Sequence, residues 1–148
     1  QELMDQASYL AEYMGRALRQ ARKELSTPPA CLTGPTAGRG FNYEITQGGQ
    51  GIKFLNSGNQ CQEFRLAGTR IEEAFWAGGV VTSQAFLTSD NITAQTLRFA
   101  IFGEPQTDNL QPKATFAIEL KGKVLQAGSQ PVTRIQTTVS QRKIDVPE

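Results

Sequence analysis

The sequence predicts an α+β domain in which a long N-terminal amphipathic helix packs against an antiparallel, strand-rich head. Two observations lead to this prediction. Only residues 1–25 show sustained helical periodicity, and the remainder shows short segments of alternating apolar and polar residues between turn signals. With 148 residues the chain is long enough for one domain, residues 1–148, with the helix at 1–25 and the β-rich head at 30–148. Because a helix and a sheet each bury one apolar face, we expect the sheet to cover the helix stripe.

The helix is predicted from apolar residues that recur every three or four positions. Its stripe comprises Leu3, Met4, Ala7, Leu10, Ala11, Met14, Ala17, Leu18, Ala21 and Leu25. The basic residues Arg16, Arg19, Arg22 and Lys23 gather near its end, where they complement the helix dipole. At 1.5 Å per residue the helix is about 37 Å long, so we expect its N-terminal half to overhang the head. Pro28 and Pro29 end it, because proline removes a donor and restricts the residue before it.

The strands are predicted from alternation and from the turns between them. They are expected at residues 41–45, 51–56, 60–67, 69–74, 93–103, 113–120 and 132–142, with a further apolar segment at 85–90 that ends in a turn. The segment 75–81 contains two glycines after an apolar run, and is either a loop packed on the core or a bulged strand. Three consecutive short strands form an antiparallel meander.

The side chains give little sign of catalysis. The sequence contains no histidine, which excludes Ser–His–Asp and Cys–His arrangements and histidine-based metal sites. Glu63 and Glu72 could meet across a hairpin as an acid–base pair, but a solvated sheet face explains them better. The glycines at 34–40 lack the Lys-Ser/Thr and helix that a phosphate loop requires. Asp90 and the loop 104–109 could offer oxygens to calcium, although Asp and Asn are ordinary turn formers. We therefore expect that the protein is not an enzyme and that it binds no cofactor or metal ion.

The two cysteines, Cys31 and Cys61, have no metal-type spacing, and we expect them to form a disulfide; two buried free thiols are the alternative. A disulfide implies a compartment outside the cytoplasm. The net charge of +1 gives no basic excess typical of nucleic-acid-binding proteins. Arg16, Arg19, Arg22 and Lys23 could contact phosphates or an acidic partner, although a solvated helix face explains them more simply.

The arrangement of the chain resembles the soluble part of a type IV pilin-like subunit, a minor pilin or minor pseudopilin. The residues that carry the resemblance are Leu-Arg-Gln-Ala-Arg at 18–22, Leu-Thr-Ser at 87–89 leading to Leu-Arg-Phe at 97–99, and Gln-Thr-Thr-Val-Ser-Gln-Arg at 136–142. The family's hydrophobic N-terminal segment has a Gly cleavage site, a Phe, a Glu at the fifth mature position and a run of apolar residues. In this chain such a segment would lie before Gln1.

The resemblance implies a non-enzymatic structural subunit of a type IV pilus or a related secretion or DNA-uptake filament, in some members placed at the tip. The preceding segment would anchor it in the inner membrane before assembly. Leu18, Ala21 and Leu25 would pack under the sheet, and the subunit interface would comprise Leu3, Ala7, Leu10 and Met14. The alternative is a secreted or surface binding module, adhesin-like, that acts through the loops 30–40 and 104–112.

Overall fold

One α-helix, one short second helix and eight strands are the elements of the described part of the chain. The computed structural model describes residues 2–22, 31–32, 42–102, 113–122 and 132–140. After α1 (Glu2–Arg19) come β1 (Tyr43–Thr46), the short helix η2 (Gln47–Gly49), β2 (Gly51–Leu55), β3 (Cys61–Ala67), β4 (Arg70–Ala77), β5 (Val80–Phe86), β6 (Ile92–Phe102), β7 (Lys113–Gly122) and β8 (Val132–Ser140).

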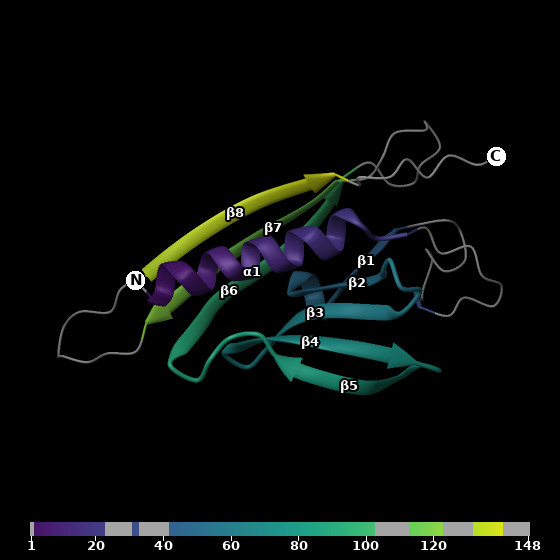
Figure 1. Cartoon of the computed structure of the whole chain (residues 1–148), viewed down its shortest axis with the longest axis horizontal. Coiled ribbons are helices and arrows are strands. Elements are labelled where there is room, and N and C mark those ends of the chain that lie inside the picture. The colour runs from purple at the N-terminus through teal and green to yellow at the C-terminus, as the bar shows by residue number, and fades with distance from the viewer. Residues whose placement is uncertain (1, 23–30, 33–41, 103–112, 123–131, 141–148) are drawn as a thin grey trace.

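The strands form two antiparallel sheets. The first has five strands in the order β1-β2-β3-β4-β5, and the second has three in the order β6-β7-β8. Neighbours in each sheet are also neighbours in the sequence, so every connection is of the hairpin kind that antiparallel strands allow. Figure 1 shows α1 lying along β6, β7 and β8, with the five-stranded sheet beside them.

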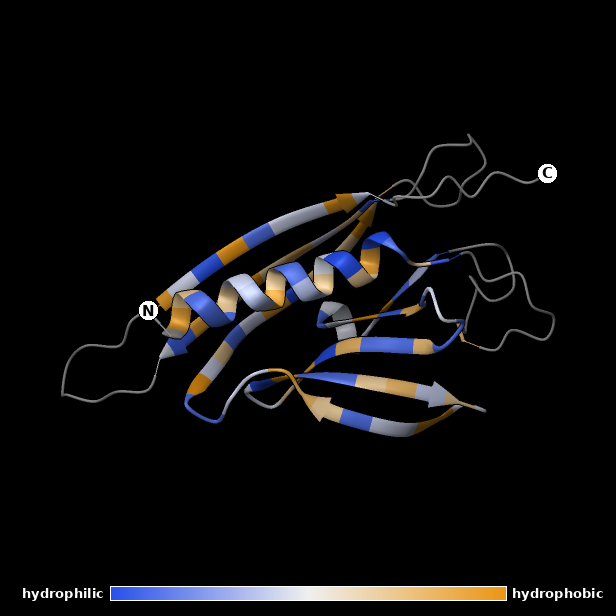
Figure 2. Ribbon diagram, viewed as in Figure 1, coloured by the Kyte–Doolittle hydropathy of each residue, from blue (hydrophilic) through white to orange (hydrophobic). Residues whose placement is uncertain are grey.

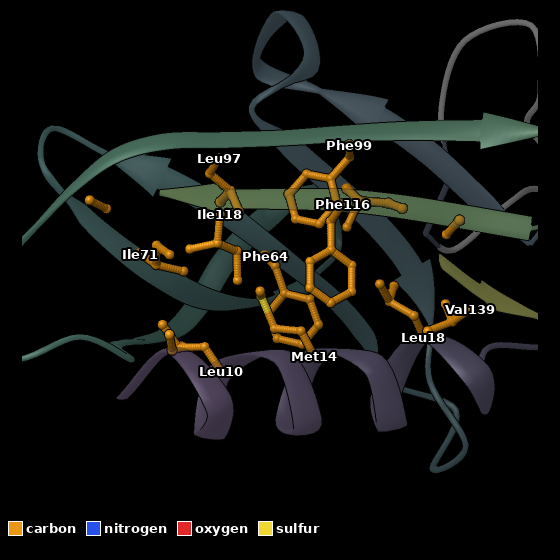
Figure 3. Close-up of a cluster of buried hydrophobic side chains, with 14 of the residues drawn as sticks. Leu10, Met14, Leu18, Phe64, Ile71, Leu97, Phe99, Phe116, Ile118 and Val139 are labelled. Atoms are coloured by element: carbon orange, nitrogen blue, oxygen red, sulfur yellow. The ribbon is translucent and has the colours of Figure 1, made fainter. Parts of the chain in front are cut away.

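A single core joins the helix to both sheets. Leu10, Met14 and Leu18 of α1 are fully buried. In Figure 3 they point toward a cluster drawn from both sheets, whose labelled members are Phe64, Ile71, Leu97, Phe99, Phe116, Ile118 and Val139. Three aromatic contacts fix the centre of this cluster, including Phe54 with Phe64 at 5.5 Å and Phe99 with Phe116 at 6.0 Å between ring centroids. The apolar stripe of α1 is therefore used inside the domain.

The predicted fold class is wrong in two respects. The described chain is mostly β-structure in two sheets, rather than a long helix on a single head. The helix has 18 residues and ends at Arg19, six residues earlier than expected. Its end is set by partners far along the chain, because the Tyr43 hydroxyl donates to the Leu18 carbonyl at 2.6 Å and the Arg22 N–H donates to the Leu55 carbonyl at 2.8 Å. Arg22 thus pairs with β2 instead of continuing the helix.

The expected overhang of the N-terminal half is also wrong. The four residues assigned to a subunit interface are buried in this chain's own core: Leu3, Ala7, Leu10 and Met14. The physical reason is that β7 and β8 run beside the helix over its length, so apolar side chains near its N-terminus meet the second sheet (Figure 1). Met4, which the periodicity also placed in the stripe, is 53% exposed.

The ambiguous segment at 75–81 is the turn of a bulged hairpin. β4 and β5 are joined at Gly78 and Gly79, whose φ angles of 60° and 81° suit a tight turn that twists with the strands. The register shifts between Phe75 and Trp76, which marks a β-bulge. The strand alternative was therefore correct, and the observed β5 begins at Val80, five residues before the apolar segment expected at 85–90.

We expect Met14→Asp to destabilise the folded domain by at least about 3 kcal/mol, because it removes core packing and buries a carboxylate. Ser8→Asp places the same side chain on the exposed face of α1, and it should leave stability within about 0.5 kcal/mol. Urea unfolding followed by circular dichroism gives both free energies. Equal stability of the two variants would contradict the placement of Met14 in the core.

Candidate functional site

The outward face of α1 presents a stripe of exposed side chains, of which Met4 is also contacted by the Thr133 hydroxyl of β8. We call Met4, Ser8, Tyr9, Glu12 and Arg16 the outer stripe; all five are exposed. Met4 is 53% and Tyr9 56% exposed, so each presents about half of a large side chain to the outside. Figure 2 shows hydrophobic and hydrophilic residues alternating along α1, as the helical periodicity requires. The stripe is mixed in character, which suits contact with another protein surface.

Two side-chain pairs order the outer stripe. The ring of Tyr9 stacks on Tyr13 one turn later, with centroids 5.8 Å apart and planes at 15°. Arg16 donates to the Glu12 carboxylate at 2.9 Å, an exposed i, i+4 ion pair. Exposed ion pairs of this kind contribute only about 0.3 to 0.5 kcal/mol, so the pair orients the side chains more than it stabilises the helix.

A cleft of about 370 Å³ opens between the second half of α1 and the turn between β2 and β3. Its described lining consists of Tyr13, Arg16, Ala17, Gln20, Asn56, Ser57, Gly58, Gln60 and Gln62. Asn56 shapes the turn, because its Oδ1 accepts from the backbone N–H groups of Gly58 and Gln60, both at 2.9 Å. Its Nδ2 donates to Gln62 Oε1 at 2.9 Å. The cleft thus offers amides, a hydroxyl, a phenol ring and a guanidinium to a small polar group.

Behind the cleft, Glu73 joins the helix to the five-stranded sheet. The Tyr13 hydroxyl donates to Glu73 Oε1, and Gln62 Nε2 donates to the same oxygen at 2.6 Å. Burial, followed by the hydrogen bond to the Glu73 carboxylate, raises the pKa of Tyr13 well above its ordinary value. The phenol therefore stays neutral and acts as a hydrogen-bond donor. The cluster of Tyr13, Gln62 and Glu73 thus has a structural role, holding α1 against the sheet.

The other face of the same sheet buries a second polar cluster. Glu63 is only 1% exposed and accepts three hydrogen bonds, from Thr46 Oγ1 at 2.5 Å, Trp76 Nε1 at 3.0 Å and Arg65 NH1 at 3.2 Å. Arg65 Nε also donates to Glu72 Oε1 at 2.7 Å. Arg65 therefore bridges the two carboxylates, Glu63 and Glu72, that the sequence suggested as a hairpin pair. Their expected position on a solvated face is wrong, because both are buried.

The disulfide is confirmed. Cys31 and Cys61 are bonded with their Cα atoms 5.2 Å apart, and the bond joins the segment after α1 to β3. Leu32, Leu55 and Trp76 pack around it in a small cluster separate from the main core. Cys61 and Glu63 alternate with inward-facing Phe64 on β3, so the disulfide and the polar cluster lie on the same outer face of the sheet.

The basic residues at the helix end have different neighbours. Arg16 pairs with Glu12 on the outer stripe. Arg22 NH1 donates to Asn59 Oδ1 at 2.8 Å, in the turn between β2 and β3. Arg19 is half-buried, and Lys23 lies outside the described residues. A role for these residues in contacting a phosphate or an acidic partner stays a prediction.

The loops 30–40 and 104–112 lie outside the described residues, apart from Cys31 and Leu32. In the described ranges, His, Cys, Asp and Glu form no group of three or more that could hold a metal ion. Over the same ranges, no helix combines the length and the apolar character that crossing a membrane requires. In comparisons with protein-family models, with curated proteins and with solved structures, nothing matches this chain. Functional inference therefore depends on the chain's own geometry.

Sequence reasoning singled out Arg16 but missed the rest of the outer stripe and the cleft. The exposed position of Tyr9 follows from its place opposite Leu10 and Met14 on the helix, so a helical wheel could have found it. The cleft could not be found in this way. It depends on how α1 lies against the β2–β3 turn, and the sequence carries no signal for that contact.

Replacing both Cys31 and Cys61 by serine should lower the free energy of unfolding by about 3 to 4 kcal/mol, the amount expected for a closed loop of this size. Urea unfolding of the oxidised chain and the double variant measures the difference. Free-thiol titration of the unfolded, unreduced chain should give no thiol. Two titratable thiols would contradict the disulfide.

Tyr13→Phe should lower stability at pH 7 by about 1 kcal/mol through loss of a hydrogen bond. The raised pKa of folded Tyr13 means that its contribution is fully present below the ordinary tyrosine pKa of about 10 and declines as the pH rises above it. The stability gap between wild type and variant should therefore narrow above pH 10. Both chains keep Tyr9 and Tyr43, so a gap that stays constant would contradict the role given to Tyr13.

Proposed function

We propose that the chain is a non-enzymatic structural subunit, a minor pilin or pseudopilin, of a type IV pilus or a related secretion or DNA-uptake filament. The observation that carries the proposal is the outer stripe of α1. An amphipathic helix whose apolar face is already buried still presents Met4 and Tyr9 to the outside. Neighbouring subunits would contact this stripe. They would not contact Leu3 or Met14, which are buried in the core of the domain.

The disulfide supports a place outside the cytoplasm. Disulfides persist in oxidising compartments and are rare where thiols are kept reduced. Cys31 and Cys61 are both part of a buried cluster, so their bond belongs to the folded domain and not to an exposed redox pair. A periplasmic or extracellular filament subunit works in such a compartment.

The polar clusters support a structural role over an enzymatic one. A catalytic carboxylate needs a perturbed environment and access to substrate. Glu63 is buried with three donors, and Glu73 accepts from Tyr13 and Gln62, so each holds secondary structure together. The carboxylates of Glu63, Glu72 and Glu73 are thus occupied by hydrogen bonds within the domain.

The proposal requires an apolar segment ahead of Gln1 in the native protein, which would anchor the subunit in the inner membrane before assembly. Intact mass and N-terminal sequencing of the protein from its native membrane or sheared surface fraction test this requirement. A methylated Phe followed by about twenty apolar residues, the length of a spanning helix, supports the filament. A native N-terminus close to Gln1, after an ordinary signal peptide, rejects it.

A second candidate function is that of a surface binding module, and the cleft beside α1 favours it. Aromatic, amide and hydroxyl side chains with a glycine are the mixture that antibody paratopes use for adaptable polar contacts. Tyr13, Asn56, Ser57 and Gly58 supply it here. Gln60→Trp should fill the cleft and abolish such binding, while filament assembly through Met4 and Tyr9, which do not line the cleft, should continue.

Tyr9→Asp should reduce recovery of the subunit in sheared filament fractions at least about tenfold, because it puts a charge into a desolvated contact. Thr93→Asp, on the exposed face of the second sheet, is the matched control and should assemble normally. Thermal unfolding of the isolated domain should be nearly unchanged in both. Normal assembly of Tyr9→Asp would show that the outer stripe is not the subunit contact.

A further inference from the structure

β5 is an open edge strand with no core of its own. It is the last strand of the five-stranded sheet, and among the described residues no strand pairs with its outer edge. Six of its seven residues are exposed and the seventh is half-buried. Val80 is 61% and Phe86 48% exposed. The strand therefore contacts little in its own chain beyond its neighbour β4.

The composition of β5 lacks the usual protection of an edge. Natural edge strands discourage pairing with other chains by carrying lysine or proline, or by being covered. The strand reads Val-Val-Thr-Ser-Gln-Ala-Phe and has no charge and no proline, although 20% of the whole chain is charged. Its one irregularity, the bulge opposite Phe75 and Trp76, affects the start of the strand. Ser83–Phe86 stays regular and open.

The direction of the free main-chain groups follows from the register. Leu87 N–H donates to the Ile71 carbonyl at 2.7 Å, and Ala85 stands opposite Glu73 in the same antiparallel pairing. Main-chain groups along an antiparallel strand point alternately to one side and the other. The backbone N–H and carbonyl groups of Leu87 and Ala85 therefore point toward β4. The backbone N–H and carbonyl groups of Gln84 and Phe86 point to the open edge.

We propose that β5 pairs antiparallel with β5 of a second copy of this chain, about a two-fold axis at Ala85. In this register Gln84 faces Phe86 of the second copy, and each exchanges an N–H and a carbonyl with the other. By symmetry the pair occurs twice, so four main-chain hydrogen bonds form. The two five-stranded sheets become one continuous sheet, a self-complementary interface of the isologous kind.

We expect the partner at the open edge to be a second copy of the chain, because β5 is complementary to itself. Uncharged strands meet without placing like charges opposite one another. Ala85, at the axis, faces its own copy in a non-hydrogen-bonded pair, where Cα atoms come within about 4.5 Å and a small side chain fits. The Phe86 ring, against which the Arg70 guanidinium rests at 3.8 Å, gains Gln84 of the second copy as cover.

The pairing is independent of the proposed filament role. α1 and β5 lie apart in the domain, so the outer stripe stays free when β5 is paired (Figure 1). A single strand pair makes a small interface, and we expect it to be weak and reversible. It would serve a secreted module as well as a filament subunit.

Sedimentation equilibrium of the oxidised chain from about 5 to 500 μM is the test, a range that covers micromolar affinity. The wild type should reach the dimer mass. Gln84→Pro removes the outward N–H without touching a bond to β4, since proline is tolerated where an edge N–H faces away from the sheet. It should raise the dissociation constant at least about tenfold. Gln84→Ala loses the side-chain contact with Arg65 and the cover over Phe86 but keeps the N–H, so its dissociation constant should rise much less than that of Gln84→Pro.

A charge exchange tests the two-fold axis and does not depend on proline. Ala85→Lys and Ala85→Glu each place like charges opposite one another, so each alone should be monomeric. Mixed in equal amounts, they should recover the dimer, and high salt should weaken it. Circular dichroism should show that each variant is folded.

Three results would overturn the proposal. The wild type could stay monomeric at the highest concentration. A wild-type dimer could survive both Gln84→Pro and Ala85→Lys, which would place the contact elsewhere. The mixture of Ala85→Lys and Ala85→Glu could fail to recover a dimer that each substitution had abolished, which would exclude the two-fold pairing at Ala85.

Discussion

One face of α1 packs against two sheets, and this packing makes a single core of them. Leu10, Met14 and Leu18 meet side chains from both sheets, so the helix is held from two directions (Figure 3). Hydrophobic burial on this scale fixes where the helix lies, and polar contacts then fix its rotation and its end. Near the middle of the helix, the Tyr13 hydroxyl donates to the Glu73 carboxylate. At the C-terminal end of the helix, the Tyr43 hydroxyl donates to the Leu18 carbonyl.

This packing limits what the molecule can use for contact with others. The inward stripe of α1 is committed to the core, so partners can reach only its opposite face. The five-stranded sheet is likewise occupied around Glu63, where the disulfide cluster and the polar cluster share its outer face. Among the surfaces that the described residues leave open are the outer stripe, the cleft and the edge at β5. The outer stripe is amphipathic, the cleft is polar, and the edge at β5 offers unpaired backbone groups. The three surfaces therefore suit different kinds of partner.

Local patterning predicted the strands well and the arrangement poorly. The segments that became β2, β3, β6, β7 and β8 were visible as alternation, because each presents one face to the core. The helix end was not visible, since Tyr43 and Leu55 decide it from a distance. Burial of Glu63 and Glu72 was hidden for a related reason. Alternation shows which residues share a face, but not whether that face is covered, so charged residues were assigned to solvent.

The disulfide has a mechanical consequence. Cys31 and Cys61 enclose a loop with a sequence separation of 30, and both β1 and β2 lie within it. A pull on the two ends of the chain is carried through the sulfur bridge and bypasses this loop. About 100 Å of backbone is thereby withheld from extension even when the sheets separate. Of the described elements, α1 and the strands after Cys61 can lengthen under tension, whereas the hairpin of β1 and β2 stays inside the closed loop.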